Sequence, residues 1–290
     1  MNLCDIKQIK QIMSVFGIRF HKEYGQNFLT NNMVVEDIAD NCCGDTDSTI
    51  LEIGPGIGSL TNELAKRYRE VVALEIDSSL IPVLAYTLGE HKNVKVINQD
   101  VMKTDLDELL GEAFKSSKVS VCANLPYYIT TPILMKLLES RLPFEYITIM
   151  IQSEVADRLC ARAGSKDFGA ITAVLNYYGE AERLFDVTAD NFVPAPKVDS
   201  SVVRIKLYRE NPYRPDSEEM LFRTIKAAFE QRRKTLANSL MTGFSSLTKD
   251  ELIEIITSCG HRADIRGERL STEDFVTLSN ALGKALKERE

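Results

Sequence analysis

The segment Asn124-Leu125-Pro126-Tyr127 combines residue types that suit chemistry on a nucleobase. It follows an apolar, strand-like run over residues 119–123, and ligands bind at the carboxyl ends of strands in open α/β sheets. Asparagine offers an amide oxygen as an acceptor, and proline fixes the backbone so that nearby carbonyls point outward. The tyrosine ring offers a face on which a planar base can stack. This combination suits presenting the exocyclic amine of a base to an electrophile, and an ordinary strand-to-turn exit is the alternative interpretation.

A glycine-rich turn, Gly54-Pro55-Gly56-Ile57-Gly58, follows another apolar run over residues 50–53. Glycine permits positive φ and lets the backbone approach a ligand closely, and the helix that follows offers free N–H groups to an anion. Ser59 occupies the last position of the GxGxxG spacing, where a dinucleotide fold needs glycine for helix packing. The turn therefore favours a nucleotide ligand other than NAD.

Two acids lie at the carboxyl ends of the next two predicted strands. Glu75 comes 21 residues after Gly54, where a carboxylate can accept both ribose hydroxyls. Asp100 follows the third strand, within reach of an adenine amino group. Either acid alone is more often a solvated carboxylate at a strand end. Together with the glycine turn and Asn124, on four successive strands, they predict a site for an adenosine with a zwitterionic tail.

The elements that must position these residues follow from the apolar pattern. Strand-like runs over residues 50–53, 71–76, 94–97, 119–123 and 146–151 alternate with helix-like segments such as 59–68. This alternation predicts βαβ units and a mainly parallel sheet. Residues 191–207 contain two prolines and then an alternating stretch, which is typical of a loop entering an antiparallel edge strand.

A polar, turn-rich stretch over residues 208–216 precedes a region with helical periodicity throughout. The sequence thus predicts an α/β domain over residues 1–210 and a small α-helical domain over residues 211–290.

Charge is unevenly distributed along the 290 residues. The net charge of −7 argues against a nucleic-acid-binding protein. Residues 222–234, however, contain one acid and five basic side chains, and such a local patch contacts phosphates. These basic residues are Arg223, Lys226, Arg232, Arg233 and Lys234. A solvated helix face is the alternative interpretation of the same run.

The sequence has no pattern typical of a membrane span, a signal peptide or a metal site. Its apolar runs are too short for a membrane span, and the N-terminus has no signal-peptide core. The cysteines and histidines lack metal-ligand spacing, so no metal is expected. We therefore expect a cytoplasmic protein with no membrane partner, and nothing in the sequence suggests more than a monomer.

The segment Asn124-Leu125-Pro126-Tyr127 resembles the ribosomal RNA adenine N6,N6-dimethyltransferases, together with Glu52-Ile53-Gly54-Pro55-Gly56 and Gly25-Gln26-Asn27-Phe28-Leu29 upstream. Residues 192–200 (FVPAPKVDS) and 229–236 (FEQRRKTL) are similar to the small-subunit (16S) branch, the KsgA/RsmA family. The resemblance implies a seven-stranded Rossmann-like methyltransferase sheet with a small C-terminal α-helical domain. It also implies S-adenosyl-L-methionine as the cofactor. The implied substrate is a pair of adjacent adenines in the 3′-terminal hairpin loop of 16S rRNA, within a small-subunit precursor.

The family's functional residues carry over by motif. The implied cofactor contacts are Asn27, Leu29, Gly54, Glu75, Asp100 and Asn124. In the catalytic segment, the Asn124 amide oxygen and the Leu125 carbonyl would accept hydrogen bonds from adenine N6. Tyr127, held after Pro126, would stack on the base, and Phe192 would form the opposite wall. The basic patch over residues 222–234 would bind RNA.

Three alternatives share parts of this pattern. The sister family that dimethylates large-subunit (23S) rRNA and confers macrolide resistance has a segment similar to residues 124–127, which we call the platform. Residues 197–200 and 231–234 nevertheless favour the small-subunit branch. DNA adenine methylation uses a related platform without the segment at 25–29 and the helical tail. The protein could instead act chiefly as a ribosome assembly factor, since the same residues serve binding and methylation.

Overall fold

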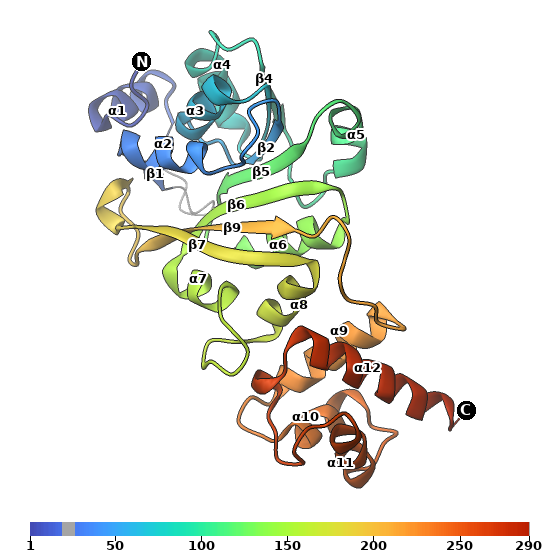
Figure 1. The fold of residues 1–290 in the computed structure, drawn as a ribbon. Coiled ribbons are helices and arrows are strands. Elements are labelled where there is room, and N and C mark those ends of the chain that lie inside the picture. Colours follow the sequence, from blue (N-terminus) through green and yellow to red (C-terminus); the bar gives the residue numbers. More distant parts are fainter. Residues whose placement is uncertain (19–26, 290) are drawn as a thin grey trace. The chain divides into compact units, whose positions relative to one another are not determined.

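A computed structural model describes residues 1–18 and 27–289 of the chain. These residues form two compact units. The first comprises residues 1–156 and 182–209, and the second comprises residues 157–181 and the chain from residue 210 onward. Figure 1 follows the chain through its elements. Within the described ranges, no helix is both long and apolar enough to cross a membrane.

The main sheet has seven strands in the order β4-β3-β2-β5-β6-β9-β7 (Figure 1). Their bounds are β2 (Thr49–Ile53), β3 (Glu70–Glu75), β4 (Val94–Asn98), β5 (Val119–Asn124), β6 (Phe144–Gln152), β7 (Gly179–Val187) and β9 (Ser200–Leu207). This confirms the predicted α/β class and the seven-stranded sheet. Each of the five strands expected between residues 50 and 151 is present, with ends that differ by up to two residues.

The first five strands of the sheet run parallel. β2 pairs with β3 and β5, β3 also pairs with β4, and β5 also pairs with β6. Every residue of β2 is buried, as expected for a central strand of a parallel sheet covered on both faces. The carboxyl ends of β2, β3, β4 and β5 therefore meet at one edge of the sheet.

The sequence prediction that residues 191–207 enter an edge strand is wrong. β9 does run antiparallel to β6, but β7 lies on its other side. Most positions of β7 are exposed or half-buried, so its sequence lacks the apolar run by which a strand is recognised.

Helices of the first unit connect the strands. They are α1 (Ile6–Val15), α2 (Asn32–Asp40), α3 (Ser59–Arg67), α4 (Ile81–Thr87), α5 (Leu106–Ser116) and α6 (Thr130–Glu139), and α7 (Ser153–Leu159) crosses into the second unit. Side-chain caps fix several starts. Asn31 accepts a hydrogen bond from the Met33 amide before α2, and Asp105 accepts two at the start of α5.

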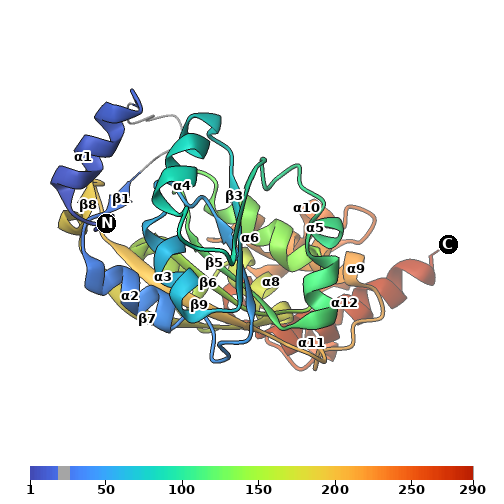
Figure 2. The same ribbon diagram turned by 90° about the horizontal axis from the view of Figure 1, so that it is seen from above.

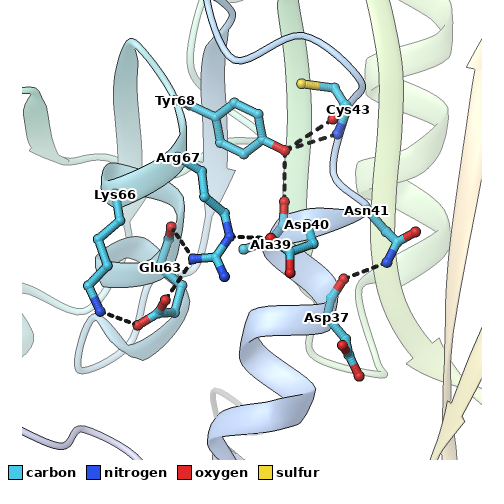
Figure 3. A network of polar contacts seen from close by, with 9 residues as sticks. All are labelled: Asp37, Ala39, Asp40, Asn41, Cys43, Glu63, Lys66, Arg67 and Tyr68. Atoms are coloured by element: carbon cyan, nitrogen blue, oxygen red, sulfur yellow. Dashed lines mark hydrogen bonds and ion pairs between the residues drawn. The ribbon is translucent and has the colours of Figure 1, made fainter.

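Polar contacts join α2 to α3 around Tyr68, which follows the last residue of α3 (Figure 3). The Tyr68 hydroxyl lies 2.7 Å from the Ala39 carbonyl oxygen, to which it donates, and also contacts the backbone of Cys43. Arg67 bridges Asp40 and Glu63. Tyr68 is buried, so its hydroxyl would be costly to leave without a hydrogen bond. These bonds satisfy it within the apolar core that packs α2 and α3 beside β2.

A two-stranded sheet pairs distant parts of the first unit (Figure 2). β1 (Phe28–Leu29) runs antiparallel to β8 (Phe192–Val193), with Leu29 opposite Phe192. The short helical turn Ala189–Asn191 precedes β8. Phe28 and Val193 pack against α1, so the β1–β8 pair is also held by the first helix of the chain.

The second unit is helical. It contains α8 (Ala170–Tyr178), α9 (Glu218–Glu230), α10 (Leu236–Gly243), α11 (Lys249–Ser258), the turn Gly267–Arg269 and α12 (Thr272–Lys287). Residues 157–181, which the sequence analysis grouped with the first domain, belong to this unit. The physical reason is that Phe168, Ala173 and Tyr177 contribute to the same apolar core as α9, α10 and α12.

Candidate active site

A cleft opens at the edge where β2, β3, β4 and β5 end. Its open space is about 1070 Å³ with the solvent at its mouth included. The six cofactor residues expected from the sequence all line it: Asn27, Leu29, Gly54, Glu75, Asp100 and Asn124. Gly25 and Gln26 of the upstream motif lie outside the described residues.

The glycine turn after β2 has the left-handed backbone that its sequence predicts. Gly54 and Gly56 have φ of 73° and 62°. A Cβ built on Gly56 would lie 2.9 Å from Cε1 of Phe28, closer than real side chains approach. Both glycines line the cleft, so the turn brings backbone instead of side chains against a ligand.

Glu75 ends β3 with its carboxylate already oriented. One oxygen accepts a hydrogen bond from the Gly56 amide at 3.1 Å, and the other accepts one from the Asp77 amide at 2.9 Å. Burial raises the pKa of Glu75, and these amides oppose the shift. The side chain is thereby fixed in place while each oxygen keeps a lone pair for a ligand hydroxyl.

Asp100 is half-buried just after β4. Its Oδ1 accepts a hydrogen bond from the Met102 amide at 2.9 Å, which fixes the carboxylate at the rim of the cleft. The fixed carboxylate can accept from an exocyclic amine.

Asn124 links the end of β5 to the start of β1. Its amide nitrogen donates to the Asn27 carbonyl oxygen at 3.2 Å. Because the amide nitrogen is used in this way, the amide oxygen is the group left to accept a hydrogen bond in the cleft.

The rest of the platform also lines the cleft. The Leu125 amide donates to the Met150 carbonyl oxygen at 3.2 Å, which ties the segment to β6. Pro126 follows, and its carbonyl accepts from the Ile129 amide at 3.1 Å. The half-buried Tyr127 places its hydroxyl 2.7 Å from the Ser200 hydroxyl, so the far end of the ring is anchored.

Phe192 occupies a different place from the one expected. It is buried opposite Leu29 in the β1–β8 pair, within the core that includes α2 and α3. It does not belong to the cleft lining in the described part of the chain. The ring supports the wall that carries Leu29.

Sequence reasoning missed Glu52, which lines the cleft from inside β2. The residue is 1% exposed, and its Oε2 has no hydrogen-bond partner among the described residues. Burial, with the charge of nearby Glu75, raises the pKa of Glu52 to about 8. An acid inside an otherwise apolar strand, two residues before the glycine turn, was the available signal.

Tyr128 is a second missed residue. It directly follows Tyr127, lines the cleft and is 62% exposed. A large aromatic side chain open to solvent at the mouth of a cleft is suited to contact an incoming base.

The five basic residues expected to bind RNA lie in the second unit in two different settings. Arg223 donates to the Gly243 carbonyl and lies over the Phe244 ring, and Arg232 donates to the Lys166 carbonyl. Both therefore have structural partners. The remaining three, Lys226, Arg233 and Lys234, are exposed and make no ion pair within the described residues.

The chain is similar to known proteins over most of its length. The family model for ribosomal RNA adenine dimethylase matches residues 17–282. A ribosomal RNA small subunit methyltransferase A from Alkaliphilus oremlandii is 44% identical over 97% of this chain and 98% of its own.

Two solved structures are similar across the chain. A dimethyladenosine transferase from Plasmodium falciparum has a TM-score of 0.70 at 23% identity, covering 86% of this chain and 95% of that one. The 23S rRNA methyltransferase ErmE has a TM-score of 0.68 at 26% identity, covering 89% of this chain and all of that one.

Proposed function

We propose that this chain, which belongs to the ribosomal RNA adenine dimethylase family, dimethylates the N6 amines of two adjacent adenines in the 3′-terminal hairpin loop of 16S rRNA. Family membership makes the protein an S-adenosylmethionine-dependent rRNA adenine dimethyltransferase. The choice of the small-subunit RNA rests on the 44% identity to a small subunit methyltransferase, against 26% to a 23S enzyme.

The cleft fits the cofactor by the chemistry of its donors and acceptors. S-adenosylmethionine supplies an electrophilic methyl group on a sulfonium. Glu75 would accept from the ribose hydroxyls, Asp100 from the adenine amine, and the glycine turn would lie against the tail. Glu52 has a buried oxygen without a partner, as expected where a cationic group of a ligand completes the site.

The chain's own task is then to position the target amine. The Asn124 amide oxygen and the Leu125 carbonyl would accept its two N–H groups, which aims the nitrogen lone pair at the methyl group. Tyr127 would stack on the base, and water would take the released proton. Holding the reactants at near-attack distance supplies the rate enhancement without a nucleophilic side chain. A base inside a helix cannot reach this cleft, so the target must be flipped out or lie in a loop.

The second unit would contribute phosphate contacts. Exposed Lys226, Arg233 and Lys234 are suited to this role, whereas Arg223 and Arg232 chiefly hold their unit together. The protein as a whole is negatively charged, which disfavours contact with RNA phosphates. The local excess of positive charge over residues 222–234 is therefore the part of the second unit that we expect to contact RNA.

The physiological partner would be a small-subunit precursor, met in the cytoplasm by a monomeric enzyme.

The observation that carries the proposal is the bond from Asn124 to Asn27, which orients the amide oxygen in a cleft lined by all six expected cofactor residues. The test is transfer of labelled methyl groups to small subunits that lack dimethyladenosine, beside protein-free large-subunit rRNA. We expect label in small subunits with the wild type and none with Asn124→Ala. Label only in large-subunit RNA would assign the other branch, and label in neither would favour an assembly factor.

A further inference from the structure

The motif Lys197-Val198-Asp199-Ser200 is one of the segments that resemble the small-subunit branch of the family, and the proposed mechanism assigns no role to it. Its last residue, Ser200, is the first residue of β9 and is completely buried. Its hydroxyl lies 2.7 Å from the Tyr127 hydroxyl. The motif therefore reaches the active-site cleft through one side chain.

Both partners of this bond are fixed to β6. Asn124, at the end of β5, lies opposite Met150, and the Leu125 amide donates to the Met150 carbonyl. Ser200 lies opposite Gln152, two residues further along the same strand. Tyr127 follows β5 and Ser200 begins β9, and both strands pair with β6.

Asp199 further constrains this point of the chain. Its backbone carbonyl accepts from the Ser153 amide at 3.0 Å, just after β6. Its side chain accepts from the Ala189 amide at 2.9 Å, in the turn before β8. Because Asp199 is bonded both to the residue after β6 and to the turn before β8, the adjacent Ser200 can act as a rigid anchor.

We propose that Ser200 is a positioning residue that holds the Tyr127 ring at the mouth of the cleft in the orientation that stacks on the target adenine. Tyr127 is half-buried, and the Ser200 hydroxyl contacts the far end of its ring. Orienting the ring before the base enters lowers the ordering cost of forming the reactive complex. The inference rests on the proposed stacking role of Tyr127.

Burial raises the pKa of the Tyr127 hydroxyl; the bond to Ser200 opposes this shift, and the charge of Asp199 adds to it. The hydroxyl therefore stays protonated at neutral pH and keeps the bond to Ser200.

The test is a double-mutant cycle of Ser200→Ala, Tyr127→Phe and the combined variant, assayed for methyl transfer to small subunits. Each single change should lower kcat by about 3- to 10-fold, the range expected for one hydrogen bond of ordinary strength. The combined variant should lose no more than the larger single loss, because both changes remove the same bond. The dissociation constant for S-adenosylmethionine should stay within twofold, which separates a positioning effect from general damage to the cleft.

A neighbouring serine provides the matched control. Ser201 is also completely buried in β9, but its hydroxyl bonds to Ser153 at 2.9 Å and to Asp186 at 2.8 Å, away from the cleft. Ser201→Ala should lower the melting temperature and leave kcat within twofold.

Two results would overturn the inference: Ser200→Ala or Tyr127→Phe with kcat within twofold of the wild type, or losses that multiply in the combined variant. Tyr127→Phe retains the ring and tests the bond even if Ser200→Ala fails to fold. Full activity in Tyr127→Ala would instead remove the stacking role itself. Loss in Tyr127→Ala with none in Ser200→Ala would reject only the positioning role.

Discussion

Replacing Glu52 with glutamine tests whether the active-site cleft contains an acid that is neutral until a ligand binds. Glu52 is buried in β2 with one unpartnered oxygen, and burial raises its pKa to about 8. Glutamine has nearly the same shape and cannot titrate. The difference in stability between the two proteins therefore isolates the proton on this one side chain.

The sign and size follow from proton linkage. The folded state holds this proton more tightly than the unfolded state, in which the pKa is 4.5. Stability from this group is therefore fully present below pH 4.5 and is lost as the pH rises to 8. Each pH unit inside this window changes the free energy of unfolding by about 1.4 kcal/mol, so the wild type should lose about 3 kcal/mol relative to Glu52→Gln between pH 5 and 7.5.

Urea unfolding of both proteins at half-unit steps from pH 5 to 8.5, without cofactor, measures this difference. Glu112→Gln provides a control on a side chain that is 91% exposed, and its difference from the wild type should not change across this range. With saturating S-adenosylmethionine, the difference in unfolding free energy between the wild type and Glu52→Gln should change less with pH. The reason is that a cation beside the carboxylate lowers its pKa. A wild-type-to-Glu52→Gln difference that stays constant within about 0.5 kcal/mol would refute the reasoning.

Further predictions concern other parts of the molecule. Tyr127→Ala should lower the efficiency of methyl transfer by about 5- to 150-fold, since stacking on one aromatic is worth about 1–3 kcal/mol; activity within twofold would remove Tyr127 from the site. Gly56→Ala should lower the free energy of unfolding by about 1–3 kcal/mol, because it combines a positive φ with a clash against Phe28, and unchanged urea unfolding would contradict this. Arg233→Ala and Lys234→Ala should each weaken binding to small subunits and reduce the slope of log affinity against log salt by about 1; an unchanged slope would show that the residue contacts no phosphate.

Local sequence patterns were sufficient to predict most of the sheet and several residues that line the cleft. Apolar runs located the five parallel strands, and parallel topology necessarily brings their carboxyl ends to one edge. Glu75 and Asp100 could be identified because Glu75 lies at the end of one such run and Asp100 lies shortly after the next. The glycine turn was recognisable because positive φ at Gly54 and Gly56 is a requirement of the backbone alone.

Features that depend on tertiary packing could not be predicted. β7 is largely polar, so β9 was mistaken for an edge strand. Phe192 matches an active-site motif, but its pairing with Leu29 buries it behind the cleft wall. Arg232 belongs to a basic run, and only the structure shows its bond to the Lys166 carbonyl, 66 residues away.

The central claim is that the enzyme modifies two adjacent adenines of small-subunit RNA. The most direct measurement incubates the wild-type protein and S-adenosylmethionine with small subunits lacking the modification, and then maps methylated nucleosides by mass spectrometry of RNA fragments. We expect two adjacent N6,N6-dimethyladenosines in the 3′-terminal hairpin loop. Dimethyladenosine at another position, or only in large-subunit RNA, would contradict it.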